Sequence, residues 1–337
     1  MEAEEYYLQR LAQQNGEFFI TKTANEWMQE ARHMPVPRKL FGDFWIEGEI
    51  CFLFAGTNVG KSILAVQIAD AISTGEYTGE FAVDCAPQKV LYFDFELSKK
   101  QFENRYSNNY QQPYQFSENF MRLEMNPNKV LTLPFETALM CALEEQLNRH
   151  RARVIIIDNL TYLKTQSLEV AKEVLPLMNS LIELKRKYNL SMMLLAHTPK
   201  RDQSRPLEVT DMAGSMQLGN LADSIFAIGR STRGGNVRYL KQLKARDGEK
   251  KYEADNVMVC ELSKEHNFIR FKQTGCDTEY THLKQSTEKE LSELDRNILE
   301  LHRGNPGMSF REIARQLGCH HFKVSRLLKK GREENEE

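Results

Sequence analysis

The residues best suited to chemistry stand together at Gly60-Lys61-Ser62, where a lysine and a hydroxyl follow a glycine. An apolar run at 50–54 precedes them and predicts a buried strand, and apolar residues with helical spacing follow at 63–72. Strand, glycine loop and helix in this order are typical of a phosphate-binding loop (P-loop), because backbone N–H groups and the helix N-terminus face an anion. The predicted nucleotide-binding residues are Ala55, Gly56, Thr57, Asn58, Val59, Gly60, Lys61 and Ser62.

Each residue type in this loop suits the binding of ATP with Mg²⁺. We expect Lys61 to reach the β- and γ-phosphates and the Ser62 hydroxyl to ligate Mg²⁺. Ala55 stands where the usual motif has its first glycine, but Gly56 follows and can adopt a positive φ. The alternative is a glycine turn that packs a helix on a sheet and binds nothing.

Acidic residues end two further apolar runs. Glu96 is the candidate general base that polarises the water attacking the γ-phosphate. Asp94 is the runner-up, because strand alternation puts both acids on the same face, and a third possibility is that Glu96 only caps the helix starting near Ser98. Asp158 follows four apolar residues at 154–157, which is the Walker B pattern, and we expect it to hold Mg²⁺.

Two more segments carry candidate functional residues. His197 ends the apolar run at 191–196, where it could sense the γ-phosphate or its water, or could be structural. The strand predicted at 237–244 ends in Lys244 and Arg246, two cations beside a turn signal. The polar loops at 159–167 and 198–212 are candidate DNA contacts through their basic residues, which are Lys164, Lys200, Arg201 and Arg205.

The composition favours a reducing environment away from membranes. The 337 residues carry a formal net charge of −2, so nucleic-acid binding must come from local basic patches. No apolar run reaches membrane-spanning length, and the acidic N-terminus does not resemble a secretory signal. The six cysteines have no metal-ligand spacing, and we expect them to be reduced thiols in the cytoplasm.

The C-terminal part predicts a separate helix-turn-helix module. Ser309 would cap one helix, Gly318 would end it, and a strongly basic helix would follow at 320–330. The alternative is a protein-docking domain with no role in DNA binding. The candidate DNA contacts on the last helix are His320, His321, Lys323, Ser325 and Arg326. The expected organisation is an N-terminal arm at 1–40, an ATPase domain at 41–273, a linker at 274–288, the helix-turn-helix at 289–332 and an acidic tail at 333–337.

In this order, the phosphate-binding loop, Glu96, Asp158, His197 and Lys244-Ala245-Arg246 resemble the RecA-like hexameric ATPases. That group includes the DnaB-type replicative helicases and, more closely similar, the RepA-like ATPases of plasmids and mobile elements. The resemblance covers about residues 40–272. It implies an α/β P-loop NTPase core with a mainly parallel twisted sheet flanked by helices, to which the small all-α helix-turn-helix domain is appended.

The resemblance also implies roles for single residues. Lys244 and Arg246 match a Lys-x-Arg that enters the ATP site of the neighbouring subunit, so that hydrolysis depends on ring assembly. The stretch from Arg205 to Ser215, with Gly214, is similar to a DNA-gripping loop, although Ala213 stands where DnaB-type chains often carry arginine.

Three functions remain open at this stage. The first is an Mg²⁺-ATP-driven homo-hexameric ring motor on single-stranded DNA, such as the helicase of a mobile element, with duplex bound by the helix-turn-helix. The second is an ATP-switched DNA-binding regulator or loader that does not unwind DNA. The third is a filament-forming recombinase, which needs a polymerisation segment that residues 1–40 do not clearly provide.

Overall fold

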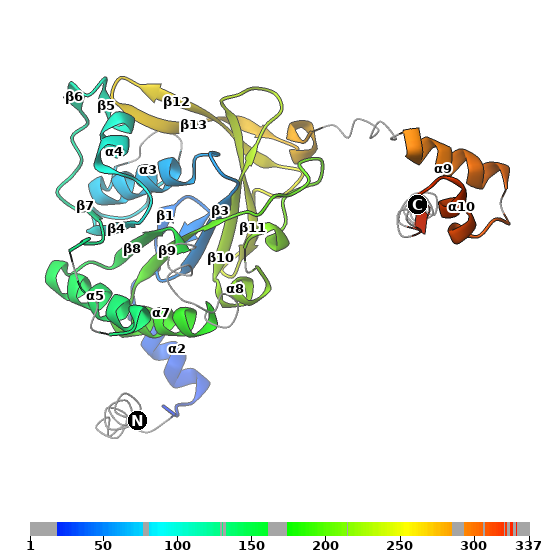
Figure 1. The fold of residues 1–337 in the computed structure, drawn as a ribbon. Coiled ribbons are helices and arrows are strands. Elements are labelled where there is room, and N and C mark those ends of the chain that lie inside the picture. The colour runs from blue at the N-terminus through cyan, green and yellow to red at the C-terminus, as the bar shows by residue number, and fades with distance from the viewer. Residues whose placement is uncertain are drawn as a thin grey trace.

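A mixed β-sheet organises the chain in the computed structural model (Figure 1). The structure describes residues 19–76, 81–128, 130, 133–160, 174–213, 215–284, 293–305, 307–319, 321, 324–325 and 328. Within these residues the main sheet has nine strands in the order β13-β12-β11-β10-β3-β9-β8-β4-β7. The six strands from β10 to β7 are parallel, and β11, β12 and β13 continue the sheet in antiparallel pairing.

The strands of the main sheet are β3 (Ile50–Ala55), β4 (Val90–Asp94), β7 (Phe120–Leu123), β8 (Val154–Asp158), β9 (Ser191–His197), β10 (Ser224–Arg230), β11 (Val237–Ala245), β12 (Val257–Glu265) and β13 (Phe268–Asp277). Two short pairs lie outside it, β1 (Lys39–Phe41) with β2 (Trp45–Ile46) and β5 (Ser107–Asn108) with β6 (Gln112–Pro113). The helices are α2 (Ala24–Arg32), α3 (Lys61–Thr74), α4 (Lys99–Arg105), α5 (Phe135–His150), α7 (Val174–Tyr188), α8 (Ser215–Leu221), α9 (Glu293–Gly304) and α10 (Phe310–Gln316). Two 3-10 turns complete the set, η1 (Val209–Asp211) and η2 (Glu279–His282).

The central strands are apolar along their whole length because both faces of the sheet are covered. In β3, Cys51, Leu53 and Ala55 join one core cluster with α3, whereas Ile50 and Phe52 join the other. That second cluster contains buried residues of α5, α7 and α8. The mainly parallel sheet between two helical layers confirms the expected α/β class. No helix among the described residues is long and apolar enough to cross a bilayer.

The helix that follows the phosphate-binding loop is buried on nearly all sides, not only on one face as its sequence predicts. The side chain of Gln67 in α3 donates to the Phe271 carbonyl of β13 at 3.0 Å and accepts the Phe271 N–H at 2.7 Å. Gly60, which precedes α3, has a φ of +115°, and a Cβ there would lie 2.8 Å from the Phe271 ring. The β12–β13 hairpin therefore packs directly over the start of this helix, and only glycine fits at Gly60.

The segment at 107–135, whose composition suggests an insertion or long loop, contributes a strand and braces α3. Its strand β7 pairs with β4 at the edge of the sheet. Tyr114 donates its hydroxyl to Asp70 Oδ2 at 2.8 Å, and Asn119 donates to the Ser73 carbonyl at 3.1 Å. Its role could not be inferred from local sequence, because these contacts join residues more than 40 positions apart.

The body built on the main sheet also extends past the boundary expected from composition. Residues 274–277 continue β13, and η2 follows within the segment assigned to a polar linker. Glu279 and His282 are buried. The Glu279 carboxylate accepts hydrogen bonds from the Leu207 N–H and from the Tyr239 hydroxyl, which satisfy it inside the fold. Polar residues that pair inside the fold resemble linker residues in composition alone.

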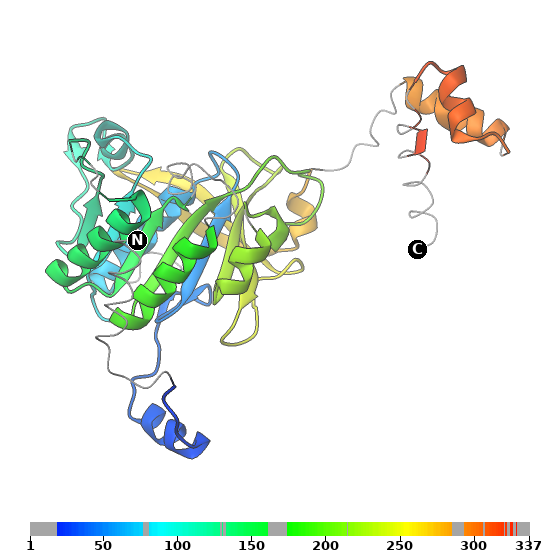
Figure 2. The ribbon, with the colours of Figure 1, turned by 60° about the horizontal axis from the view of Figure 1, so that its bottom comes forward.

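The two ends of the described chain differ in their packing. The predicted helix α2 is present, capped by Thr23, but buries none of its residues and extends away from the body in both views (Figures 1 and 2). Trp27 and Met28 on this helix are exposed. The C-terminal helices α9 and α10 have a small core of their own, built on Ile298, Ile313 and Val324.

Replacing Asp70 by Asn tests the cost of its buried charge. Burial raises the pKa of Asp70 from 3.8 to about 6. Because the folded-state value is the higher one, the stability that the neutral carboxyl contributes is complete below pH 3.8 and is lost as the pH rises through about 6. Asp70→Asn has no charge to bury, so we expect it to unfold at a higher urea concentration than the native chain at neutral pH. The expected gain in the free energy of unfolding is at most ~3 kcal/mol.

Urea denaturation between pH 5 and pH 8 measures this difference. The advantage of Asp70→Asn should grow with pH and level off above pH 7, whereas the exposed Asp84→Asn should show no such trend. A pH-independent difference between Asp70→Asn and the native chain would contradict the assignment.

Candidate functional site

The parallel strands bring the predicted catalytic residues together at one edge of the sheet. β3 leads into the phosphate-binding loop, β9 ends at His197, and β8 ends at Asp158, with Ala55 paired to His197 in register. Asn58 in the loop has a φ of +58°, which an asparagine tolerates. Side chains that follow carboxyl ends of parallel strands meet at the same edge, so this edge is the candidate active site.

A chain of hydrogen bonds joins three of the predicted residues. The Lys61 ammonium lies 3.0 Å from His197 Nδ1, and His197 Nε2 lies 3.0 Å from Glu96 Oε1. Since a lysine ammonium can only donate, Nδ1 must accept, and Nε2 carries the proton that reaches Glu96. Asn159, the residue after the Walker B aspartate, donates its side-chain amide to the same Glu96 oxygen and contacts His197. Asn159 was not identified from the sequence, since no motif marks it.

The hydrogen bonds set the electrostatic state of this chain. The bond from His197 is the main cause of the lowered pKa of Glu96, with the Lys61 charge adding to it, so Glu96 is ionised and a weak base. Burial lowers the pKa of Lys61, while Asp158 and Glu96 oppose that effect. The lysine of the phosphate-binding loop and the candidate base are therefore linked through one imidazole.

The Walker B aspartate has the properties of a cation ligand. Asp158 is fully buried, Tyr92 donates its hydroxyl to Oδ2 at 2.7 Å, and Oδ1 makes no hydrogen bond within the described part of the chain. Burial raises the pKa of Asp158 to about 6, and the adjacent Ser62 side chain opposes this rise. A buried carboxylate oxygen without a donor, next to a hydroxyl, fits Mg²⁺ held by Ser62 and Asp158.

The geometry separates the two acids that strand parity could not distinguish. Asp94 Oδ1 accepts the N–H groups of Glu96 and Leu97 at 3.0 and 2.9 Å, and Oδ2 accepts Arg122 Nε at 2.8 Å. A carboxylate with both oxygens occupied in this way shapes the turn and is poorly placed to accept a proton from water. The geometry therefore favours Glu96 as the base.

Two arginines that no motif marked lie against the outside of the phosphate-binding loop. Arg238 is buried and donates Nε to the Val59 carbonyl at 2.9 Å and Nη1 to the Gly235 carbonyl at 2.8 Å. Arg230 reaches the Asn58 carbonyl at 3.4 Å. Burial, and then the charge of Arg230, lowers the pKa of Arg238, and neither forms an ion pair among the described residues. Arg238 thus fixes the backbone of the phosphate-binding loop at Val59.

The predicted trans-acting cations lie at the opposite edge of the sheet. Arg246 donates to Asp223 Oδ1 at 2.6 Å, and Asp223 Oδ2 accepts the N–H of Ile50, the first residue of β3. Lys244 donates to the Gly219 carbonyl at 2.7 Å. β3 has six residues, so about 20 Å of strand separates this edge from the loop that follows it. Arg246 therefore cannot complete the site of its own chain.

The candidate DNA-contacting loop pairs two of its cations internally. Arg205 lies 2.5 Å from Asp211 Oδ1, and Arg201 lies 3.3 Å from Asp211 Oδ2. Arg201 is also largely buried, with its guanidinium donating to loop carbonyls. Lys200 is exposed. The loop offers fewer available cations than its sequence indicates.

The remaining candidate DNA contacts fall largely outside the described residues. Those outside are Lys164, Gly214, His320, Lys323 and Arg326. Ser215 begins α8, and the candidate contacts His321 and Ser325 are half-buried.

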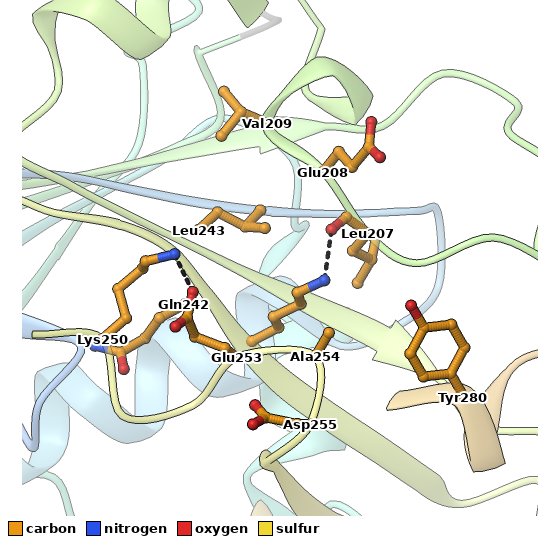
Figure 3. A pocket seen from close by; sticks show the side chains of 11 residues that line it. Leu207, Glu208, Val209, Gln242, Leu243, Lys250, Glu253, Ala254, Asp255 and Tyr280 are labelled. Carbon is orange, nitrogen blue, oxygen red and sulfur yellow. Dashed lines mark hydrogen bonds and ion pairs between the residues drawn. The ribbon is translucent and has the colours of Figure 1, made fainter. Parts of the chain in front are cut away.

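A separate pocket of about 630 Å³ lies beside β11 (Figure 3). Leu243 and Val209 form part of its lining, and Lys250 forms an ion pair with Glu253 at its margin. The other two carboxylates that line this pocket, Glu208 and Asp255, disfavour the binding of a phosphate group. None of the predicted nucleotide-binding residues lines the pocket. Its lining residues are Leu207, Glu208, Val209, Lys241, Gln242, Leu243, Lys250, Glu253, Ala254, Asp255 and Tyr280.

Replacing Arg238 by Met tests its support of the phosphate-binding loop. Loss of the guanidinium leaves the Val59 and Gly235 carbonyls without a donor, so we expect ATP affinity to fall about tenfold. Equilibrium titration with a fluorescent ATP analogue measures this. Arg230→Met is the matched control, because the exposed Arg230 makes one long hydrogen bond within the described part of the chain. Equal affinities of Arg238→Met and the native chain would contradict the role.

A family described as AAA domain matches residues 21–203, which is more than half of the chain. No curated protein matches the sequence. Among solved structures, the KaiC-like protein PH0186 from Pyrococcus horikoshii OT3 is similar at a TM-score of 0.46 and 12% identity, over 67% of this chain and 90% of that chain. The phosphate-binding loop, Glu96 and Asp158 all lie within the matched residues, and the chain belongs to the AAA domain family.

Proposed function

We propose that the chain is an Mg²⁺-dependent ATPase that assembles as a ring, hydrolyses ATP between subunits and acts as a motor on DNA. Membership of the AAA domain family supports nucleotide binding and hydrolysis. The ring and the DNA motor are our inference from the arrangement of residues, together with the resemblance to RepA-like and DnaB-type ATPases.

One observation carries the proposal. The Lys61–His197–Glu96 chain lies at the carboxyl edge of the parallel strands, and Arg246 is bonded at the opposite edge. A subunit built in this way has half of an ATP site at each edge. Stacking copies with the same contact repeated, edge to opposite edge, brings the halves together, and such a heterologous contact closes into a ring when its rotation permits.

The side chains then act in sequence as ATP enters. Lys61 leaves the neutral His197 for the phosphates, since an ammonium binds an anion more strongly. His197 loses the donor that fixes its ring, and its bond to Glu96 can break. Because that bond lowers the pKa of Glu96, its loss makes the carboxylate a stronger base for the attacking water. Mg²⁺, held by Ser62 and Asp158, would neutralise charge on the phosphate oxygens.

Arg246 of a second copy supplies the remaining positive charge. A guanidinium contributed in trans stabilises the charge that develops on the transferred phosphoryl group, which is typically worth ~10³–10⁵ in turnover. Hydrolysis in our proposal therefore requires assembly.

The proposed DNA-binding role involves two basic regions, the C-terminal segment at 309–332 and the loop at 198–212. The segment from 309 to 332 contains seven arginines and lysines against one acid, Glu312, which suits phosphate contact. The internal pairing of Arg201 and Arg205 with Asp211 favours the second candidate function, an ATP-switched regulator or loader that binds DNA chiefly through its C-terminal module.

Mixing two inactive variants tests hydrolysis between subunits. Arg246→Ala should bind ATP without turnover, because no subunit donates an arginine to its neighbour. Glu96→Gln should also bind ATP without turnover, because each site lacks its general base. In mixed oligomers, an Arg246→Ala site beside a Glu96→Gln neighbour is complete, so an equal mixture should recover about a quarter of native turnover. No recovery at any ratio, with mixed oligomers shown by a tagged pull-down, would contradict the proposal.

Strand displacement distinguishes a motor from a switch. Forked DNA with a 5′ or a 3′ single-stranded tail is incubated with the native chain, ATP and Mg²⁺, with Lys61→Ala as the control that lacks the phosphate-binding lysine. The motor predicts unwinding of one tail polarity, lost in Lys61→Ala. DNA-stimulated hydrolysis without unwinding would instead support the regulator or loader.

A further inference from the structure

Asp223 lies where three chain segments meet, immediately before β10. Its Oδ1 accepts Arg246 Nη1 at 2.6 Å, and its Oδ2 accepts Lys185 Nζ at 2.7 Å and the Ile50 N–H at 2.9 Å. The residue is only 8% exposed. Burial alone would raise the pKa of Asp223, but the bonds from Lys185 and Ile50 and the charge of Arg246 lower it, so the carboxylate is ionised.

The carboxylate is fixed, whereas the arginine it binds projects outward. Ser224, the next residue, pairs with Cys51 of β3 and with Ala245 of β11, so Asp223 just before β10 lies beside Arg246 just after β11. The Arg246 side chain is 58% exposed even though its anchor is buried. A single bond to Nη1 uses one of the five N–H donors of a guanidinium.

This arrangement suits a cation held ready for an anion on another molecule. A free arginine side chain loses rotamer freedom when it is fixed, and a fixed anchor removes much of that loss before the ligand arrives. Lys244 is held in the same way by the Gly219 carbonyl. Both cations of the Lys-Ala-Arg segment are thus anchored to residues between the start of α8 and the start of β10.

We infer that Asp223 is a positioning residue for catalysis in trans: it orients Arg246 at the edge of one copy toward the phosphates bound by the next. The inference rests on the proposed action of Arg246 between subunits and adds the residue that sets its geometry. Asp223 itself touches neither ATP nor water in this account.

Asp223→Asn in the full chain is the primary variant. The amide keeps an oxygen for the Ile50 N–H but loses the charge that holds Arg246, so we expect kcat to fall about 10- to 100-fold at unchanged ATP affinity. Lys185→Met is the matched control, because it removes the other ion pair of Asp223 and leaves Arg246 bound. It should keep kcat within about twofold of the native value.

Subunit mixing shows through which residue Asp223 acts. If Asp223→Asn impairs the arginine that a subunit donates to its neighbour, Glu96→Gln subunits, whose arginine is intact, should restore turnover. Arg246→Ala subunits should not restore it. A purely structural defect in the chain's own ATP site would give the reverse pattern. Should Asp223→Asn fail to fold, Asp223→Glu keeps the charge but displaces it, and it should show the same pattern with a smaller loss.

The outcomes separate this inference from the proposed function. Rescue of Arg246→Ala by Glu96→Gln without rescue of the Asp223 variant would overturn the role of Asp223 alone. No rescue of Arg246→Ala either would refute catalysis between subunits. Higher turnover of Asp223→Asn would show that Asp223 restrains Arg246, and an equal loss in Lys185→Met would show that the ion cluster only stabilises the fold. Either result overturns the inference.

Discussion

The structure depends on one constraint, the common direction of six neighbouring strands. The strands β4, β8, β9 and β3 all end at the same edge. Glu96, Asp158, His197 and the phosphate-binding loop therefore meet there although they are far apart in the sequence. The same constraint places the start of β10 at the other edge, and the antiparallel pairing of β11 with β10 brings the end of β11 and Arg246 to it. The Lys61–His197–Glu96 hydrogen bonds can form only because of this alignment.

The fold class, and the gathering of the candidate site residues at one edge of the sheet, could be predicted from local patterns. A buried parallel strand is apolar along its length, so a polar residue at its end is conspicuous, as at Asp158 and His197. Asn159 and Arg238 could not be predicted, because their partners lie far away in the sequence and polar residues of these types are common in loops and strands. For the same reason, the C-terminal boundary of the main domain could not be predicted, because Glu279 lies in a polar segment and bonds to a residue far away in the sequence.

The antiparallel strands do more than complete the sheet. β13 packs over the first turn of α3 through Phe271, and Arg238 of β11 donates a hydrogen bond to the Val59 carbonyl in the loop. The phosphate-binding loop is thus held between parts of the chain that local sequence does not connect to it. A fixed loop keeps its N–H groups aimed at one point, which is what electrostatic stabilisation of a phosphoryl group requires.

The central claim is that each ATP site needs residues from two copies of the chain. Turnover per subunit, measured across a dilution series alongside sedimentation of the same samples, tests it most directly. We expect specific activity to be near zero for the monomer and to rise with the fraction of assembled protein, while ATP binding by the monomer persists. A monomer that hydrolyses ATP at the full rate of the assembled protein would contradict the account.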